Sequence, residues 1–505
     1  MGGTSFLIFL LPPPGGGGLG RGGLNGYHAR TSLAPDLLPL TIELKTVKTI
    51  AIIGAGITGV TTAYALARRG FLVTLFEQHR YAAMETSYAN GGQLSACHAE
   101  VWNHGATLIK GLKWMLRPDA PLLLNPKPSW HKLSWLAGFI TAIPRYRQNT
   151  QALARLAIAA RAPLQAWAEA EAIQFDLRRE GILHIYRGRK EFERAAEVSK
   201  LLSAAGLERR AVTPEEMRAI EPALQGNFYG GYFTESDASG DIHLFTQGLV
   251  AALSRYGASC HFGARVQGLI PQGGRVRVLA RLAPRSNVTR GRGTGPERDT
   301  KAVAGPHPGQ VSASPAGAGT GPDPGLTDEK NVSGATDALF DAVVICAGTA
   351  SRALAARLGD RINIYPVKGY SISLHLGDEA SRAAAPKVSL LDDEVKLVSS
   401  RLGMDRLRVA GTAEFNGFNR DIRADRIRPL IEWVEANFPA VCTREVTPWA
   451  GLRPMNPDLQ PRVGPSRVPS IFYNTGHGHL GWTLSAATAE QMAVTVARYL
   501  GGGAI

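Results

Sequence analysis

The sequence predicts an α/β fold in two domains: a Rossmann-like domain with a parallel sheet, and an α+β domain built on a mixed antiparallel sheet. Residues 46–78 read strand–helix–strand around the glycines of GAGITG. Three later segments, YSISLHL, VKLVSS and RLRVAGTAEF, alternate apolar and polar residues as half-exposed antiparallel strands do. The chain has 505 residues, enough for two domains with cores of their own.

Composition excludes several classes of function. No segment approaches the about 20 apolar residues that a membrane-spanning helix needs. The net charge of +14 comes from arginines spread along the chain without a basic run, so we expect no nucleic-acid partner, although an anionic membrane surface stays open. The four cysteines have no metal-ligand spacing and indicate a reducing compartment, so we expect a cytoplasmic protein with no metal, and peripheral association with the inner membrane stays open.

Two segments are predicted to be disordered because they cannot bury a core: a leader, 1–45, and an insertion, 285–337. The insertion contains no Ile, Phe, Tyr, Trp or Met. The segments that flank it, RVRVLARL and ALFDAVVICAG, read as strands, so we interpret it as a long loop between two strands. Residues 1–35 contain two arginines and no acid, which leaves organelle targeting as a weak alternative.

Two stretches match G-x-G-x-x-G, and only one has the required context. Gly54–Gly59 follows an apolar strand, precedes a helix-compatible run and is followed by a second strand that ends at Glu77. Gly18–Gly23 lies in a proline–glycine tract and has none of these neighbours. The sequence therefore predicts one dinucleotide site, at Gly54–Gly59.

Each part of this motif has a physical task. Gly54 permits the tight turn, Gly56 lets the backbone approach a pyrophosphate, and Gly59 lets the helix pack on the strand. The helix begins near Ile57 and Thr58, where unpaired N–H groups face the phosphates. Glu77 can accept both hydroxyls of an adenosine ribose.

The motif alone does not distinguish NAD from FAD. The segment Glu85–Ala96, ETSYANGGQLSA, offers small side chains and exposed backbone N–H groups, above all at Ser87, Asn90 and Gly91. Such a loop can line a ribityl–pyrophosphate chain, which favours FAD, whereas in isolation it could equally be a polar surface loop.

From Lys48 to Leu500 the chain resembles the FAD-dependent amine oxidoreductases of the D-amino-acid oxidase superfamily, and within it the D-amino acid dehydrogenases of the small-subunit type. The matching stretches are ETSYANGGQLS, Ile109–Leu122, the D-x-x-G-D-x-x-L-F-T-Q run of Asp237–Gln247, VVICAGTAS, YPVKGYS, GLRPMNPD and NTGHGHLGWT. The last three are the most diagnostic.

The resemblance implies a glutathione-reductase-like architecture in which both domains are discontinuous. The FAD-binding domain would comprise 46–108, 233–362 and 446–501. The substrate domain would comprise 109–232 and 363–445.

A substrate carboxylate site is predicted at Arg453 in GLRPMNPD. Its guanidinium is the group suited to bidentate capture of a carboxylate, and in the resembling families the arginine of G-x-R-P binds the substrate carboxylate. A surface arginine on a turn is the alternative. The resemblance also places Lys368 and Tyr370, in YPVKGY, beside the flavin or the substrate.

Further cofactor contacts are predicted from two small-residue stretches. The glycines of NTGHGHLGWT precede a helix and would aim N–H groups at the flavin. His477 and His479 in this stretch could be mistaken for a metal pair, but we expect no metal because no third ligand is evident. The remaining predicted FAD contacts are Val266, Ala347, Gly348, Gly476, Gly478, Gly481, Trp482 and Thr483.

The implied function is oxidative deamination of D-amino acids, with D-alanine as the expected substrate. Hydride would pass from Cα to flavin N5, and the electrons to a quinone or another acceptor. The first alternative is a glycine/sarcosine- or opine-type amine oxidase of the same superfamily. A remote alternative is a non-catalytic FAD-binding assembly module. The sequence leaves the oligomeric state open.

Overall fold

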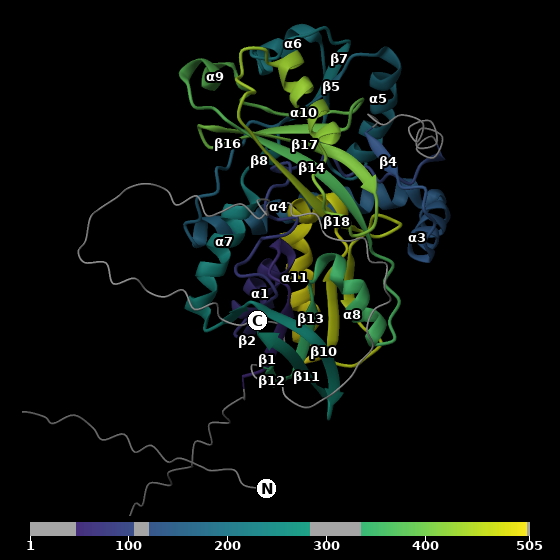
Figure 1. The fold of residues 1–505 in the computed structure, drawn as a ribbon, viewed down its shortest axis with the longest axis vertical. Coiled ribbons are helices and arrows are strands. Elements are labelled where there is room, and N and C mark those ends of the chain that lie inside the picture. Colours follow the sequence, from purple (N-terminus) through teal and green to yellow (C-terminus); the bar gives the residue numbers. More distant parts are fainter. Residues whose placement is uncertain (1–46, 106–120, 283–334, 502–505) are drawn as a thin grey trace, which may run out of the picture. The chain divides into compact units, whose positions relative to one another are not determined.

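The computed structural model describes residues 47–105, 121–282 and 335–501. The predicted leader 1–45, the second glycine motif at Gly18–Gly23 and residues 285–334 of the predicted insertion lie outside the described residues. Figure 1 shows the parallel strands and α11 in its lower half and the larger sheet with α9 and α10 in its upper half.

The parallel sheet confirms the predicted Rossmann-like fold. Its order is β19-β20-β13-β1-β2-β9, and all neighbours are parallel except β19 with β20. The strands are β1 (Thr49–Ile53), β2 (Leu72–Glu77), β9 (Ser259–Phe262), β13 (Ala342–Ile345), β19 (Arg462–Pro465) and β20 (Ile471–Thr475).

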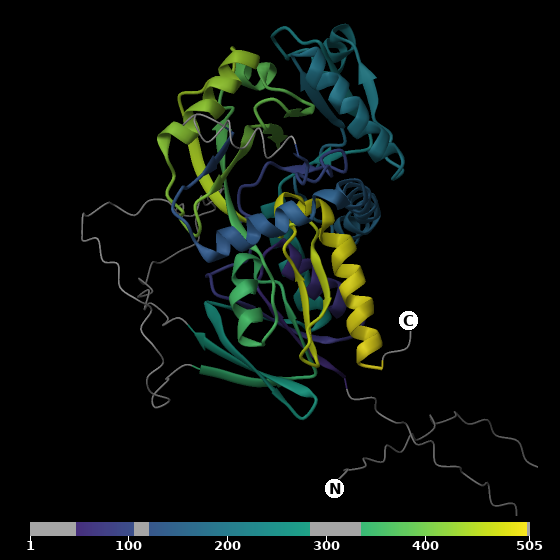
Figure 2. The same cartoon turned by 90° about the vertical axis from the view of Figure 1, so that its right-hand side faces the viewer.

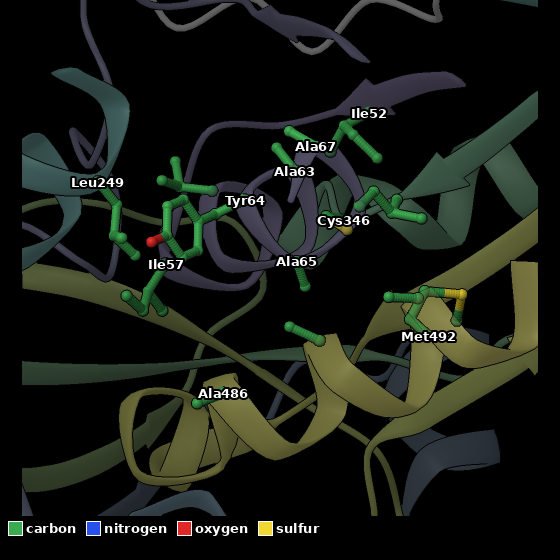
Figure 3. Packing of buried hydrophobic residues seen from close by; sticks show 14 of the residues in the cluster. Ile52, Ile57, Ala63, Tyr64, Ala65, Ala67, Leu249, Cys346, Ala486 and Met492 are labelled. Carbon is green, nitrogen blue, oxygen red and sulfur yellow. The ribbon is translucent and has the colours of Figure 1, made fainter. Parts of the chain in front are cut away.

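Two helices cover one face of this sheet and pack closely on one another. They are α1 (Ile57–Ala67) and α11 (Gly481–Tyr499), with α7 (Ile242–Leu253) against α1. Ten of the eleven residues of α1 are buried, and several are alanines, which lets the two backbones approach. Figure 3 shows Ala65 of α1 pointing toward α11, which carries Ala486 and Met492, whereas Ala63 and Ala67 lie on the side of Ile52 in β1.

The predicted helix Ser485–Leu500 begins four residues earlier than expected, at Gly481. A 3-10 turn, η4 (Gly478–Leu480), leads directly into it. The glycines that predicted close approach to a cofactor therefore belong partly to the first turn of the helix.

The predicted insertion joins two antiparallel strands. A three-stranded sheet has the order β10-β11-β12, with β10 (Ala264–Gln272), β11 (Arg275–Leu282) and β12 (Ala335–Phe340). Residues 335–337, predicted to be disordered, instead belong to β12 because they pair with Leu279–Arg281. The segment ALFDAVVICAG is not one strand, because it passes at Asp341 from this sheet into β13.

The second sheet has nine strands, in the order β18-β14-β17-β16-β15-β5-β7-β6, and β4 pairs with β17. The four strands nearest to the site are β14 (Tyr365–His375), β16 (Leu397–Leu402), β17 (Arg406–Phe415) and β18 (Val446–Met455). The others are β4 (Leu122–Leu124), β5 (Ile182–Tyr186), β6 (Arg210–Val212), β7 (Gly230–Thr234) and β15 (Ser389–Asp392).

One expected domain boundary falls inside this sheet. We assigned residues from 446 onward to the FAD-binding domain, but β18 pairs along its whole length with β14. Only after Met455 does the chain return to the parallel sheet through β19. The rest of the expected domain division stays a prediction.

The remaining elements frame these sheets. Figure 2 shows α11 along the parallel strands, the nine-stranded sheet above and the three-stranded sheet below. The helices not yet given are α3 (Trp130–Thr141), α4 (Tyr146–Ala170), α5 (Arg189–Ser203), α6 (Pro214–Ile220), α8 (Ser351–Arg357), α9 (Glu379–Ala384) and α10 (Ala424–Asn437). A short pair, β3 (Gln93–Leu94) with β8 (Ala238–Ser239), completes the described sheets.

The glycine turn allows a matched test of stability. A Cβ on Gly59 would lie 1.8 Å from the carbonyl oxygen of Gly54, whereas a Cβ on Gly56 would meet only Ser87 Oγ, at 3.6 Å. We expect Gly59→Ala to destabilise the apoprotein by about 3 kcal/mol or more, because a backbone atom must move, and Gly56→Ala to leave it unchanged. Denaturant unfolding of both variants measures this difference, and equal stabilities would contradict it.

Candidate active site

The turn between β1 and α1 is tightly packed at Gly54 and Gly59 and open at Gly56. Gly54 has a φ of +103°, and a Cβ there would lie 2.7 Å from the carbonyl oxygen of Cys346. Gly54 and Gly59 are thus required by the fold itself, whereas the surroundings of Gly56 are open. The open face at Gly56 fits the approach of a pyrophosphate to the N-terminus of α1.

Two polar side chains hold this turn. The Glu77 carboxylate accepts the N–H of Ala55 at 2.7 Å on one oxygen and the N–H of His79 at 2.9 Å on the other. Ser87 Oγ accepts the N–H of Ile57, the first residue of α1, at 3.0 Å. Each carboxylate oxygen of Glu77 keeps a further lone pair, so the group can still accept ribose hydroxyls.

The loop predicted to line the cofactor is tied to the nine-stranded sheet. The Arg408 guanidinium donates to the carbonyl of Asn90 at 3.1 Å, and Ser400 Oγ donates to the carbonyl of Gly91 at 2.8 Å. A Cβ on Gly91 would lie 2.4 Å from Val398 Cγ2. The loop therefore connects the dinucleotide turn to β16 and β17.

The FAD contacts predicted at Val266, Ala347 and Gly348 also lie close to the β1 end of this turn. Val266 of β10 and Ala347, after β13, both pack against the apolar cluster that contains Ile53 of β1. Gly348 has a φ of +53°, and no atom lies within 4 Å of a Cβ placed there. This edge is apolar and uncrowded, which suits a planar base.

The stretch NTGHGHLGWT lies where β20 passes into α11. Gly476 has a φ of +78° and would clash with Asn456 if it carried a Cβ, whereas Gly478 and Gly481 have neighbours only at 3.5 Å. Thr483 Oγ1 accepts the N–H of Ser95 at 3.1 Å, which fixes the lining loop to α11.

Trp482 is the second residue of α11. Its side chain is 2% exposed and belongs to the core cluster between α1 and α11. Its contact with the cofactor stays a prediction. Among the described residues its indole N–H has no hydrogen-bond acceptor.

One cavity collects four of the predicted site residues. It is bounded by the loop that follows Thr86, by β14, β17 and β18, and by His479 of η4. Asn90, Gly91, Tyr370 and Arg453 line it. The dinucleotide turn reaches the same loop through Ser87.

The guanidinium of Arg453 lies flat on a glycine. Strands β14 and β18 place Gly369 opposite Gly451 and Val367 opposite Arg453. A Cβ on Gly369 would lie 2.3 Å from the guanidinium carbon of Arg453. The guanidinium donates to the carbonyl oxygens of Thr412, at 2.8 Å, and Gly411, at 3.4 Å, so its orientation is fixed by backbone acceptors.

The charge of Arg453 is not neutralised by the protein. No carboxylate of the described residues forms an ion pair with it, and burial lowers the pKa of Arg453 to about 10. A guanidinium held this way still carries its proton near neutral pH but lacks a counter-ion. The arrangement therefore suits an anionic ligand, above all a carboxylate.

Lys368 does not reach the cavity. Its ammonium is fully buried and contacts Asn419 Oδ1 at 2.6 Å, the carbonyl of Asp421 at 3.1 Å and Glu414 Oε1 at 3.3 Å. Side chains alternate along a strand, and Gly369 faces Arg453, so its neighbour Lys368 faces the opposite side. The expected contact of Lys368 with flavin or substrate is corrected accordingly.

Tyr370 borders the cavity but its hydroxyl is already engaged. The hydroxyl donates to Glu414 Oε2 at 2.8 Å. Burial and then the Glu414 carboxylate raise the pKa of Tyr370. Its ring packs in the core cluster of the nine-stranded sheet, so the side chain supports the wall of the cavity.

The structure also brings in cavity residues that sequence reasoning missed. Trp449 and Thr412 line the cavity, as do His98, Trp102 and His479. Thr412 has a φ of +59°, a strained conformation for a β-branched residue, at a bulge of β17. Of these residues, the sequence pattern indicates a functional role only for His479, and only as a possible metal ligand. No metal-binding cluster occurs within the described ranges.

The chain is similar to known proteins over most of its length. The family model described as FAD dependent oxidoreductase (DAO) matches residues 49–304 and 319–494. The chain is 52% identical over 453 residues to D-amino acid dehydrogenase 3 of Mesorhizobium japonicum, covering 89% of this chain and 97% of that one. It is 36% identical over 450 residues to D-amino acid dehydrogenase of Dechloromonas aromatica, covering 88% and 96%.

Solved structures share the fold at low identity. Glycine oxidase from Geobacillus kaustophilus superposes with a TM-score of 0.63 at 18% identity, covering 90% of this chain and 95% of that one. L-proline dehydrogenase from P. horikoshii gives a TM-score of 0.61 at 15% identity, covering 90% and 94%. Because the family model spans most of the sequence, the chain belongs to the DAO family of FAD-dependent oxidoreductases.

Proposed function

We propose that this flavoprotein catalyses FAD-dependent oxidative deamination of D-amino acids to 2-oxo acids and ammonia. The observation that carries the proposal is the partly buried guanidinium of Arg453, which faces a cavity and has no counter-ion among the described residues. The relatives that are 36% and 52% identical are both D-amino acid dehydrogenases.

The described residues fit FAD at both ends of the turn. We propose that the cofactor is held by backbone and small side chains, with Glu77 on the ribose, and that bound FAD supplies the acceptor for the hydride that leaves the substrate Cα. The proposed contacts are Gly54, Gly56, Ile57, Thr58, Gly59, Glu77, Ser87, Asn90, Gly91, Val266, Ala347, Gly348, Gly476, Gly478, Gly481, Trp482 and Thr483.

Arg453 contributes orientation. A bidentate grip on the carboxylate fixes where Cα lies, and a further contact to another Cα substituent is needed to select one enantiomer, because the bond between Cα and the carboxylate can still rotate. The lone pair of the neutral substrate amine would form the C=N bond as the hydride leaves, which gives an iminium ion, and water would then hydrolyse this ion to the 2-oxo acid and ammonia. No protein group needs to move a proton in the step itself, and we assign no general base.

D-Alanine as substrate and a quinone as electron acceptor are the finer parts of the proposal. The word dehydrogenase in the names of the relatives supports an acceptor other than oxygen. Glycine oxidase resembles the chain at only 18% identity, so this likeness concerns the fold and does not favour the glycine oxidase alternative.

We also propose a cytoplasmic protein that associates peripherally with a membrane through α3. Trp130, Leu133 and Ile140 are 88%, 48% and 51% exposed and recur at the spacing of one helical face. Exposed Lys127, Arg145 and Arg147 flank this helix. Such a face suits an anionic lipid surface. Within the described residues, no helix could span a bilayer.

The role of Arg453 predicts a graded loss. Arg453→Ala should lower kcat/KM for D-alanine by at least about 100-fold, mainly through KM, because a charged hydrogen-bonded pair is lost. Arg453→Lys keeps the charge but not the fork, and should lose about tenfold. Steady-state kinetics with an artificial electron acceptor measures both effects, and an unchanged KM in Arg453→Ala would refute the carboxylate role.

A second variant displaces the guanidinium without removing it. In Gly369→Ala the new Cβ would meet Arg453 at 2.3 Å, so KM should rise at least about tenfold although Arg453 is intact. Gly268→Ala is the matched control, because its Cβ would have only ordinary contacts, the nearest at 3.5 Å. A wild-type KM in Gly369→Ala would show that the position of Arg453 is unimportant.

If α3 contacts a membrane, substitutions on its exposed apolar face should change lipid binding and nothing else. The double variant Trp130→Glu/Leu133→Glu should lose several-fold of its binding to phosphatidylglycerol vesicles in a sedimentation assay. Met404→Glu, at a residue that is 68% exposed, should bind as the wild type does. Vesicle binding that survives the double substitution would exclude α3 as the contact.

A further inference from the structure

His479 is a cavity residue to which the proposed reaction has so far assigned no task. It lies in η4, immediately before α11, and lines the same cavity as Arg453. Its ring stacks on Trp102, with centroids 5.2 Å apart and planes 22° apart, and contacts the ring of His98 at 4.9 Å. Two aromatic neighbours thus hold the imidazole in one orientation.

The hydrogen bond of His479 fixes its tautomer. Nε2 lies 3.4 Å from the carbonyl oxygen of His98, and because a carbonyl can only accept, Nε2 carries the hydrogen. In the neutral imidazole the lone pair is then on Nδ1. Burial, followed by the positive charge of Arg453, lowers the pKa of His479 to about 4, and Lys396 acts in the same direction.

The neighbouring histidine behaves differently. His477 is buried outside the cavity, and its Nε2 is 3.0 Å from Thr488 Oγ1 inside α11. Of the two histidines in NTGHGHLGWT, only His479 is therefore placed to contact a ligand. Its neutral ring offers a hydrogen-bond acceptor near a guanidinium that offers donors.

These contacts complement the two polar groups of an α-amino acid. We propose that the imidazole of His479 accepts a hydrogen bond from the α-amino group of the substrate whose carboxylate Arg453 binds. The inference rests on the proposed function and adds a second anchor to it. With the carboxylate and the amine both held, the direction of the Cα–H bond is set for one enantiomer only.

The test uses two substrate analogues that the enzyme cannot oxidise. 2-Aminoisobutyrate carries the carboxylate and the amine but no Cα hydrogen, and isobutyrate carries the carboxylate without the amine. Their dissociation constants are measured on the holoenzyme from the perturbation of flavin absorbance. His479→Phe keeps the ring that stacks on Trp102 but removes the acceptor, and His479→Gln restores an acceptor.

His479→Phe should weaken binding of 2-aminoisobutyrate by about tenfold or more and change binding of isobutyrate by less than about twofold, with partial recovery in His479→Gln. Arg453→Ala should weaken both ligands. Equal effects of His479→Phe on the two ligands, or none on either, would overturn the inference while leaving the proposed function intact. If Arg453→Ala affects neither ligand, the proposed carboxylate site fails, and this inference fails with it.

Discussion

The packing of the Arg453 guanidinium on the backbone of Gly369 is the contact on which the proposed site depends. It requires two facing glycines on β14 and β18, backbone acceptors from the bulge of β17, and an opening that no side chain of the described residues fills. A guanidinium without a counter-ion is costly to bury, and the fold tolerates it because carbonyl oxygens satisfy part of its donors. The remaining donors face the cavity.

One loop links the parallel sheet to the nine-stranded sheet beside this cavity. Ser87 caps α1 at one end of the loop, and the carbonyls of Asn90 and Gly91 are bound by β17 and β16 at the other. Thr483 then ties the loop to α11. A cofactor that follows the loop from Gly56 would have its reactive end beside Arg453, which explains why two separate sheets are needed for one reaction.

The sequence predicted the elements whose chemistry is local. The turn at Gly54–Gly59 and the strand end at Glu77 follow from glycine spacing and strand length, whereas the role of Arg453 follows from the resemblance of GLRPMNPD to a known family. The side chain of Lys368 and the sheet that contains β18 could not be predicted in the same way, because strand facing and sheet membership depend on pairing between distant segments. Trp102 and His98 pack against His479 although His98 and His479 are 381 positions apart in the sequence, so no local pattern indicates this contact.

The central claim is that the cavity orients an α-amino acid so that only the D-enantiomer can donate its hydrogen. Anaerobic mixing of the purified holoenzyme with D-alanine and with L-alanine tests this directly, because the flavin loses its yellow absorbance when it is reduced. The account predicts bleaching by D-alanine and by further D-amino acids, and none by their L-enantiomers on the same timescale. Bleaching by L-alanine at an equal rate, or by no D-amino acid of the panel, would contradict it.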